Sequence, residues 1–252
     1  MNPRKSIAIA LLMSAVIAAP AWAQTLNISG GTVPYSEVIE PNLPAIKKAA
    51  GVDIKFNGNG VGKGMLELLE GKVGIVAVAD TLGESIKAAK KAAEAAGREV
   101  KVPDNLFFTK IGTDELVLIV HKSNPIAALT KDQAKDIATG KVVNWKDVGG
   151  PDLPIQVVTT EPSLAPGQFF KRTIMGGADY VKTAKEAASP KDTITLVSKE
   201  KGGFGMAADT HMKTNAGEAK AIKTTAMIRP LGLVTVGEPT GDAAKVANFL
   251  KK

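Results

Sequence analysis

The stretch VDIKFNGNGVGKGMLELLEGKVGIVAVAD, residues 52–80, decides the fold class of this chain. It opens with side chains that alternate in polarity, which predicts a strand with one buried face. A glycine-rich loop (58–64) and an apolar-periodic helix follow, and the segment 73–80 is typical of a strand that is buried on both faces. A strand, a helix and a second strand at this spacing predict a largely parallel α/β sheet.

The same order of elements continues on both sides of this stretch. We expect a short strand at 25–29 and a helix at about 35–50 before it. After it, we expect a helix at about 83–96 and two strands, at 106–112 and 115–122. The alternation of strands and helices therefore extends over the first half of the chain.

The second half of the chain follows the same pattern. A helix is expected between Thr130, as its N-cap, and Gly140, just after its end. Because the length suffices for two units of roughly a hundred residues each, we expect two α/β lobes. The other elements expected here are a strand at 155–160, a helix from 167, short strands at 193–198 and 202–208, and a final strand, turn and helix.

The first 23 residues have the layout of a secretory signal peptide. Arg4 and Lys5 precede an apolar stretch (7–19), and Ala21-Trp22-Ala23 forms a cleavage site before Gln24. The apolar stretch is too short for a membrane-spanning helix. We therefore expect an exported, soluble, periplasmic protein, without a lipoprotein anchor because no cysteine follows the site.

Composition excludes several classes of site. The chain has no cysteine and only two histidines, His121 and His211, so thiol chemistry and Cys-rich or His-rich metal sites are excluded. The formal charge of +7 falls to +5 when Arg4 and Lys5 leave with the leader, and only 4% of the residues are aromatic. We expect no nucleic-acid partner, no metal and no cofactor; the mild positive charge favours anions.

Three loops that follow predicted strands are candidates for one ligand site. They are residues 30–34, 58–64 and 157–170, and Asp80 ends a further strand. Ligands of α/β sheets lie beyond the carboxyl ends of the strands, where helix N-termini favour anions. The loop 58–64 does not match a P-loop and so assigns no phosphate contact to Lys63. Lys63 is therefore either a solvated loop lysine or an anion contact. Asp80 is either a ligand residue or a helix cap.

Several segments together resemble the phosphate-type solute-binding proteins of bacterial ABC transporters. The resemblance covers nearly the whole mature chain. It implies a type II periplasmic-binding-protein fold of two lobes, with a mixed sheet in each lobe, two interlobe crossovers, a ligand in the cleft, an ABC permease as partner, and no catalysis. The segments are HKSNPIAALTKDQAKDIATGKVVNWKDVGG (121–150), SGGTVPY (29–35), NGNGVGKGMLELLEGKVGIVAVADTL (57–82) and RPLGLVTVGEPTG (229–241).

The order of these segments predicts the division of the chain. After the signal peptide (1–23), lobe 1 is expected to comprise residues 24–114 and 222–252, and lobe 2 residues 115–221. The segments ELVLIVHK and KAIKTTAMIRPLG would be the crossovers. We expect a monomer.

The ligand residues of the family carry over only in part. Thr32 and the Val33 amide match first-loop contacts, and Asp80 matches the acid that accepts a phosphate proton. In the second loop the ligand hydroxyl would fall at about Val61, which has none. We expect the cleft to be lined by Thr32, Val33, Asn59, Val61, Asp80, Thr160, Ser163 and Leu164, with Lys63 as a candidate anion contact.

The third loop departs most from the family pattern R-x-x-x-S-G-T. Residues 160–166 read TEPSLAP, so Thr160 stands at the arginine position and Pro166, which lacks an N–H, at the last position. Ser163 is the one hydroxyl that could substitute in a shifted loop, and Glu161 would repel an anion. Since a buried phosphate needs matching donors, we expect a less charged, more apolar organic ligand.

Alternatives stay open. The chain could bind phosphate or another oxyanion, or serve as a periplasmic sensor or accessory subunit on the same fold. An enzyme such as a dehydratase would need an acid/base pair, for which Asp80 and Glu161 are the only candidates found in the sequence.

We predict that the exported protein starts at Gln24, because Ala23 ends a signal-peptidase site. N-terminal sequencing of the protein isolated from the periplasm checks this start. A mature chain that still begins at Met1 would contradict it.

Overall fold

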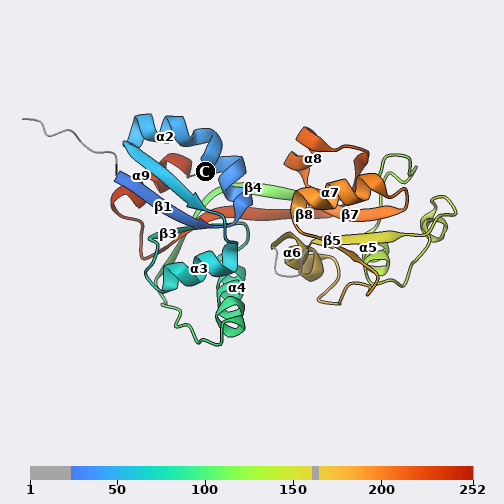
Figure 1. Ribbon diagram of the computed structural model, residues 1–252, viewed down its shortest axis with the longest axis horizontal. Helices are drawn as coiled ribbons and strands as arrows, with labels where there is room; N and C mark the ends of the chain where they lie inside the picture. Colours follow the sequence, from blue (N-terminus) through green and yellow to red (C-terminus); the bar gives the residue numbers. More distant parts are fainter. Residues whose placement is uncertain (1–23, 161–164, 252) are drawn as a thin grey trace, which may run out of the picture.

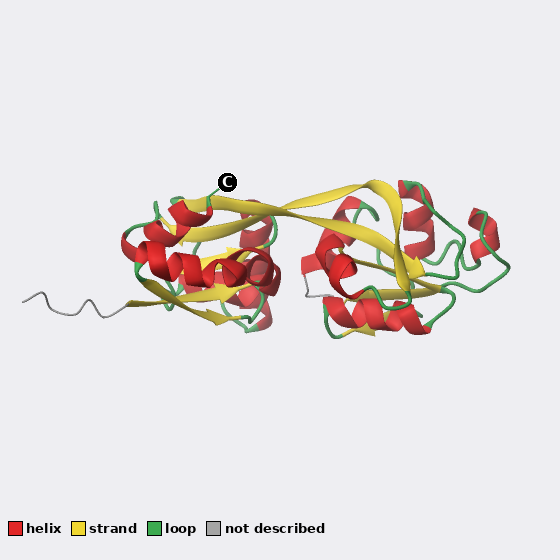
Figure 2. Ribbon diagram, turned by 90° about the horizontal axis from the view of Figure 1, so that it is seen from above, coloured by secondary structure: helices red, strands yellow, loops and turns green. Residues whose placement is uncertain are grey.

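Two lobes joined by two long strands make up the molecule (Figure 1). The computed structural model describes residues 24–160 and 165–251. The joining strands are β4 (Leu106–His121) and β8 (Ala219–Val236), seen in Figure 2 as long yellow ribbons that pass together from one lobe to the other. No helix in these two ranges is long and apolar enough to cross a membrane.

Lobe 1 holds the N-terminal elements and the C-terminal helix, and lobe 2 the elements between β4 and β8. Lobe 1 contains β1 (Gln24–Gly30), α1 (Thr32–Pro34), the π-helix η1 (Tyr35–Ile39), the 3₁₀-helix η2 (Glu40–Asn42), α2 (Leu43–Ala50), β2 (Val52–Asn57), α3 (Val61–Leu69), β3 (Ile75–Val78), α4 (Leu82–Ala95) and α9 (Gly241–Leu250). Lobe 2 contains α5 (Lys131–Ala138), the 3₁₀-helix η3 (Trp145–Val148), β5 (Gln156–Thr160), α6 (Ala165–Thr173), β6 (Lys185–Ala187), α7 (Pro190–Lys199), β7 (Gly203–Ala208) and α8 (Asp209–Asn215).

The strands form one connected sheet in the order β2-β1-β3-β8-β4-β7-β5-β6. Strands β1, β2 and β3 are parallel to one another, as are β5, β6 and β7. The joining strands β4 and β8 run antiparallel to each other and to their outer neighbours β7 and β3. The expected α/β fold with a mixed sheet is therefore confirmed, although the sheet is one and runs through both lobes, and its parallel parts lie at the two outer ends.

Helices cover both faces of each half of the sheet, and each lobe has its own apolar core. In lobe 1, one buried cluster lies under η1, α2 and α9 and another under α3 and α4. In lobe 2, one lies under α5 and α6 and another under α7 and α8. The residue boundaries of the lobes stay a prediction, because β4 and β8 are continuous through both lobes and no break marks a boundary.

The glycines of the 58–64 segment serve packing. Helix α3 already begins at Val61, so the predicted loop ends earlier than expected. A Cβ on Gly62 would lie 2.8 Å from the Ala88 carbonyl oxygen of α4, and one on Gly64 would lie 2.7 Å from the Gly30 Cα of β1. Both glycines let α3 approach its neighbours closely, which explains a helix that starts inside a glycine-rich stretch.

Residues 193–198 form part of helix α7, so the strand predicted for them is wrong. The Ser189 hydroxyl accepts a hydrogen bond from the Asp192 N–H at 3.2 Å, and Pro190 occupies the first turn, which together begin a helix. Ile194 and Val197 then lie on the buried side, one helical turn apart. The cap and tertiary burial override the strand preference of the β-branched residues.

The two strands predicted at 106–112 and 115–122 are a single strand, β4. Thr113 and Asp114, which lie between the two predicted strands, stay extended because they pair with Pro230 and Arg229 of β8. The irregularities appear as register shifts between Lys110 and Gly112 and between Leu116 and Leu118.

Several other boundaries follow the sequence more closely. The Thr130 cap is confirmed, with a full capping box to Gln133, and Gly140 adopts a left-handed φ of +79°. The first helix is a succession of α1, η1, η2 and α2 that begins at Thr32 rather than near Tyr35. The short elements β6 and α8 were not predicted.

A buried ion pair holds β4 and β8 together where they pass between the lobes, a place called the crossing below. Asp114 of β4 faces Arg229 of β8 in the register. The Arg229 Nε and Nη2 groups donate to Asp114 Oδ2 at 2.7 and 2.5 Å, and Arg229 and Asp114 are 0% and 2% exposed, respectively. Removing one partner would leave an unmatched buried charge.

Replacing Gly64 by alanine is expected to destabilise the protein by about 1–3 kcal/mol, because the new methyl group overlaps the Gly30 backbone. The control is Gly83→Ala in α4, where a Cβ meets nothing within 4 Å. That change should be neutral or stabilising by up to about 1 kcal/mol. Urea unfolding measures both, and equal stabilities would contradict the packing role of Gly64.

Arg229→Met is expected to lower the free energy of unfolding by about 3–5 kcal/mol, because Asp114 stays buried without its partner. The double variant Asp114→Leu/Arg229→Met should regain most of this loss, since no charge is then buried. Lys245→Met, which breaks the exposed pair with Asp242, should cost less than about 1 kcal/mol. Denaturant unfolding that shows no difference between the Arg229 and Lys245 variants would refute the argument.

Candidate ligand site between the lobes

The carboxyl ends of strands from both lobes point at the crossing. Along β3, the pairing moves from Val234 to Gly232 of β8, so β3 runs toward the crossing from lobe 1. Along β7, it moves from Val120 to Leu116 of β4, so β7 runs toward the crossing from lobe 2. Since β1 and β2 are parallel to β3, and β5 is parallel to β7, the loops after all five strands face the opposite lobe. This arrangement places the predicted ligand loops around one interlobe region.

In the first loop, the structure separates two predicted ligand residues by exposure. Thr32, at the start of α1, is exposed. The Val33 side chain is buried in the core of lobe 1, so only its backbone can meet a ligand. The Gly31 N–H is already bonded to the Ala77 carbonyl at 2.9 Å.

The second loop offers less to a ligand than predicted. Asn59 donates from Nδ2 to Glu67 Oε1 at 2.8 Å, inside lobe 1. The Val61 side chain is buried in the cluster under α3 and α4. Lys63, in the first turn of α3, is exposed. Of these three, Lys63 is the one whose side chain is free to reach far from its helix.

Asp80 has both carboxylate oxygens engaged. Its Oδ1 accepts from the Thr81 N–H at 2.8 Å, and its Oδ2 accepts from Arg172 Nη2 at 2.7 Å. The residue is 7% exposed. The N-cap of α4 is Thr81, whose hydroxyl accepts from the Glu84 N–H at 3.3 Å, so Asp80 supports the residue before the helix rather than capping it. Its other oxygen reaches the opposite lobe, and its role toward a ligand stays a prediction.

Arg172 of α6 is the residue that the sequence prediction missed. Besides Asp80, it binds Glu84 of α4 through Nη1 at 3.1 Å, so it links lobe 2 to lobe 1. Its guanidinium lies 5.3 Å from the centre of the Phe169 ring. The prediction looked for an arginine only within the loop. The rarity of arginine could have indicated this residue: beyond residue 23, this lysine-rich chain has only Arg98, Arg172 and Arg229.

The third loop is described only at its ends. Glu161, Ser163 and Leu164 lie outside the described residues. Thr160, at the end of β5, is buried, and its Oγ1 has no hydrogen-bond partner in the described structure. A Cβ on Gly167 would lie 2.5 Å from that oxygen, so the first turn of α6 packs directly on Thr160.

A hollow of about 250 Å³ opens beside Thr160 in lobe 2. Gln168, Lys171 and Tyr180 contribute to its lining. Burial raises the pKa of Tyr180 to about 12, with partial compensation by a hydrogen bond to Thr159. The phenol therefore keeps its proton at neutral pH and remains a hydrogen-bond donor.

A second interlobe contact lies on the other face of the sheet. Thr210, at the start of α8, donates a hydrogen bond to Glu37 of η1. Burial raises the pKa of Glu37, the Thr210 bond opposes this, and nearby Asp114 raises the pKa further. Burial also lowers the pKa of His211, and Lys191 adds to the effect, so His211 is neutral at pH 7.

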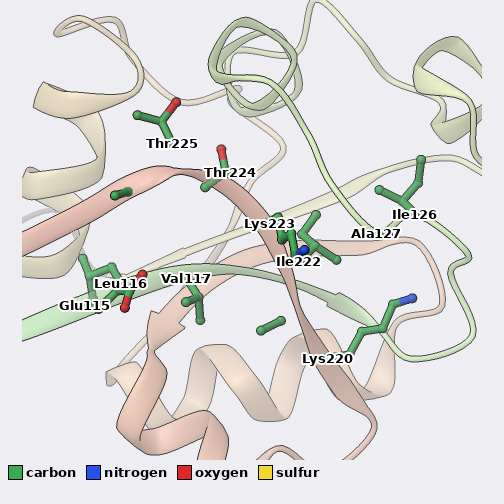
Figure 3. Close-up of a pocket in the computed structure, with 12 residues that line it drawn as sticks. Glu115, Leu116, Val117, Ile126, Ala127, Lys220, Ile222, Lys223, Thr224 and Thr225 are labelled. Carbon is green, nitrogen blue, oxygen red and sulfur yellow. The ribbon is translucent and has the colours of Figure 1, made fainter.

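A larger hollow, of about 500 Å³, lies beside the crossing (Figure 3). It forms where β8 departs from β4, since Leu116 pairs with Met227 but Leu118 pairs with Ile222. Its lining comes mainly from residues 115–117 and 220–226. No predicted ligand residue contributes to its lining.

Comparison with known proteins agrees with this architecture. A family model described as a PBP superfamily domain matches residues 18–251. The phosphate-binding protein PstS of Bacillus subtilis is 25% identical over 240 residues, which are 90% of this chain and 75% of that protein. The phosphate-binding protein PstS of Staphylococcus epidermidis is 32% identical over 117 residues, but the match covers 45% of this chain and only 35% of that protein's length.

A solved structure shows the same fold. A Clostridium perfringens protein, assigned as a phosphate ABC transporter substrate-binding protein and crystallised with bound phosphate, is similar with a TM-score of 0.72 and 26% identity. The similarity covers 90% of this chain and 92% of that one. Because the family model spans nearly the whole chain and the two-lobed fold agrees with it, the chain belongs to the PBP superfamily, and it is similar to the phosphate-type binding proteins named above.

Proposed function

We propose that this protein is a solute-binding protein that captures a small ligand between its lobes and delivers it to the permease of an ABC importer. The observation that carries the proposal is the convergence of five strand ends on one interlobe region. The ion pair between Asp80 and Arg172 adds a contact between lobes in that region. The relatives named above are binding proteins, and we propose no catalytic activity for this chain.

The site that we propose is the one predicted from the sequence. Thr32 and the backbone of Val33 would face the ligand from lobe 1, next to Asp80, and Thr160 would be near it from lobe 2. Lobe closure would bend β4 and β8 at the crossing, with lobe 1 as residues 24–114 and 222–252. From the second loop, Asn59 and Val61 would border the site with their side chains turned into lobe 1, and Lys63 would be an anion contact. Ser163 and Leu164 complete the proposed lining.

The ligand that we propose is organic and less charged than inorganic phosphate. A buried phosphate requires hydrogen-bond donors and positive charge around its oxygens. Here each Asp80 carboxylate oxygen already accepts one hydrogen bond, from the Thr81 N–H or from Arg172, so at most one acceptor position remains on each for a ligand hydroxyl or amine. Thr160 stands where the family pattern has arginine, and Val61 where it has a hydroxyl. Each replacement removes a donor or positive charge from the region.

Phosphate itself is the second candidate, favoured by the comparisons. The relatives and the crystal structure similar to this chain are named for phosphate. The Bacillus subtilis protein and the Clostridium perfringens structure, which both match most of this chain, are only 25% and 26% identical to it. Such low identity leaves room for a different ligand on the same fold.

Isothermal titration of the mature protein with inorganic phosphate is expected to show no micromolar binding, because the phosphate donors are missing. Native mass spectrometry of protein purified without refolding is expected to show a bound organic molecule instead. For that molecule, Asp80→Ala should weaken binding by about 5–150-fold, the usual effect of leaving a buried partner unpaired.

The matched control is Asp53→Ala, which removes an exposed lobe 1 carboxylate paired with Lys47 and should leave affinity unchanged. A micromolar dissociation constant for phosphate at physiological salt would overturn the ligand assignment. If Asp80→Ala lowers only the melting temperature, Asp80 is an interlobe contact but no ligand residue.

A further inference from the structure

Four charged side chains form a chain of ion pairs at the edge of the interlobe region. Asp80 binds Arg172 Nη2 at 2.7 Å, and Arg172 Nη1 binds Glu84 Oε2 at 3.1 Å. Glu84 also binds Lys87 through its other oxygen at 2.8 Å. Acid and base alternate along this chain, so the charges of the four groups sum to zero. The positive charge of Arg172 is therefore already matched before any ligand arrives.

The inner part of this chain is shielded from water. The side chain of Asp80 is 10% exposed, that of Glu84 24% and that of Arg172 36%, whereas Lys87 is 74% exposed. Charge interactions are stronger at such partly buried groups than on an open surface. Arg172 already forms ion pairs with both Asp80 and Glu84. An additional anion beside these two carboxylates would therefore be repelled by them.

The neighbouring lysine shows that position 172 is special on this helix. Lys171 pairs with Asp179 within lobe 2, at 2.5 Å. Arg172 makes its ion pairs only with lobe 1 in the described structure, while the Phe169 ring lies beside its guanidinium. Arginine has five N–H donors, and the bonds to Asp80 and Glu84 use one from each terminal nitrogen. Donors remain for a carbonyl or hydroxyl oxygen, without any need for a negative charge.

We propose that Arg172 is a specificity-determining residue of the interlobe site, which admits oxygen-bearing ligands of no net charge and rejects dianions such as hydrogen phosphate or sulfate. This rests on the proposed function and names its substrate class. A ligand of no net charge leaves the ion-pair chain balanced. A dianion adds two unmatched negative charges beside Asp80 and Glu84.

The test is to remove the two negative charges that pair with Arg172 while keeping the shapes of the side chains at positions 80 and 84. In Asp80→Asn/Glu84→Gln, the amide oxygen introduced at position 80 can still accept from the Thr81 N–H, as Asp80 does. Titration with sulfate and with inorganic phosphate is expected to show binding at least about tenfold tighter than in the wild type, because the partly buried Arg172 is then unmatched, whereas Lys87 is largely exposed. Adding Arg172→Gln to the double variant should abolish the gain.

Asp179→Asn is the matched control, since it frees Lys171 on the same helix but leaves the interlobe chain intact. It should give no gain. Melting curves establish that each variant is folded, and the single Glu84→Gln variant, with a smaller gain expected, replaces the double variant if that one is unfolded. A folded variant without gain, or an equal gain in Asp179→Asn, would overturn the role of Arg172. A micromolar dissociation constant of the wild-type protein for phosphate would refute the proposed ligand class, independently of the variants.

Discussion

The buried ion pair between Asp114 and Arg229 is the interaction on which the two-lobed arrangement depends. Both long strands leave one apolar core, to which Ile111 and Leu231 belong, and enter another, to which Leu116 and Met227 belong, and the ion pair lies between the two. The Arg229 guanidinium binds one Asp114 oxygen through two nitrogens, at 2.7 and 2.5 Å, and fixes β4 against β8 at that point. A shift in the pairing of β4 with β8 would leave each buried charge without its partner, so the ion pair also opposes such a shift.

The relation between the lobes follows from this crossing. With β4 and β8 shared, the outer strands of each lobe direct their carboxyl ends at the opposite lobe. Polar contacts then link the lobes on both faces of the sheet: Arg172 with Asp80 and Glu84 on one, and Thr210 with Glu37 on the other. The described structure thus brings its lobes together through its own side chains, and these are the groups that a ligand must accommodate.

Local patterns predicted most elements but not the charged contacts between them. The alternation in 52–57 and the capping box at Thr130 depend on near neighbours, and both elements form as expected. Residues 193–198, predicted as a strand, belong to helix α7, whose start at Ser189 the sequence prediction did not include. Arg172 was missed because it lies in α6 beyond residues 160–166, the segment in which an arginine was sought. The roles of the predicted ligand residues stay predictions, and Ser163 and Leu164 lie outside the described residues.

The sequence by itself determined most of the order of strands and helices, the exclusion of thiol chemistry and the resemblance to the phosphate-type binding proteins. These properties depend on periodicity, composition and motifs that neighbouring residues carry. Only the tertiary structure decided that Asp80 pairs with Arg172, 92 residues away, and Asp114 with Arg229, 115 residues away. An ion pair requires two groups within a few ångströms, and for residues this far apart in the chain that distance depends on how the two lobes fold and meet at the crossing.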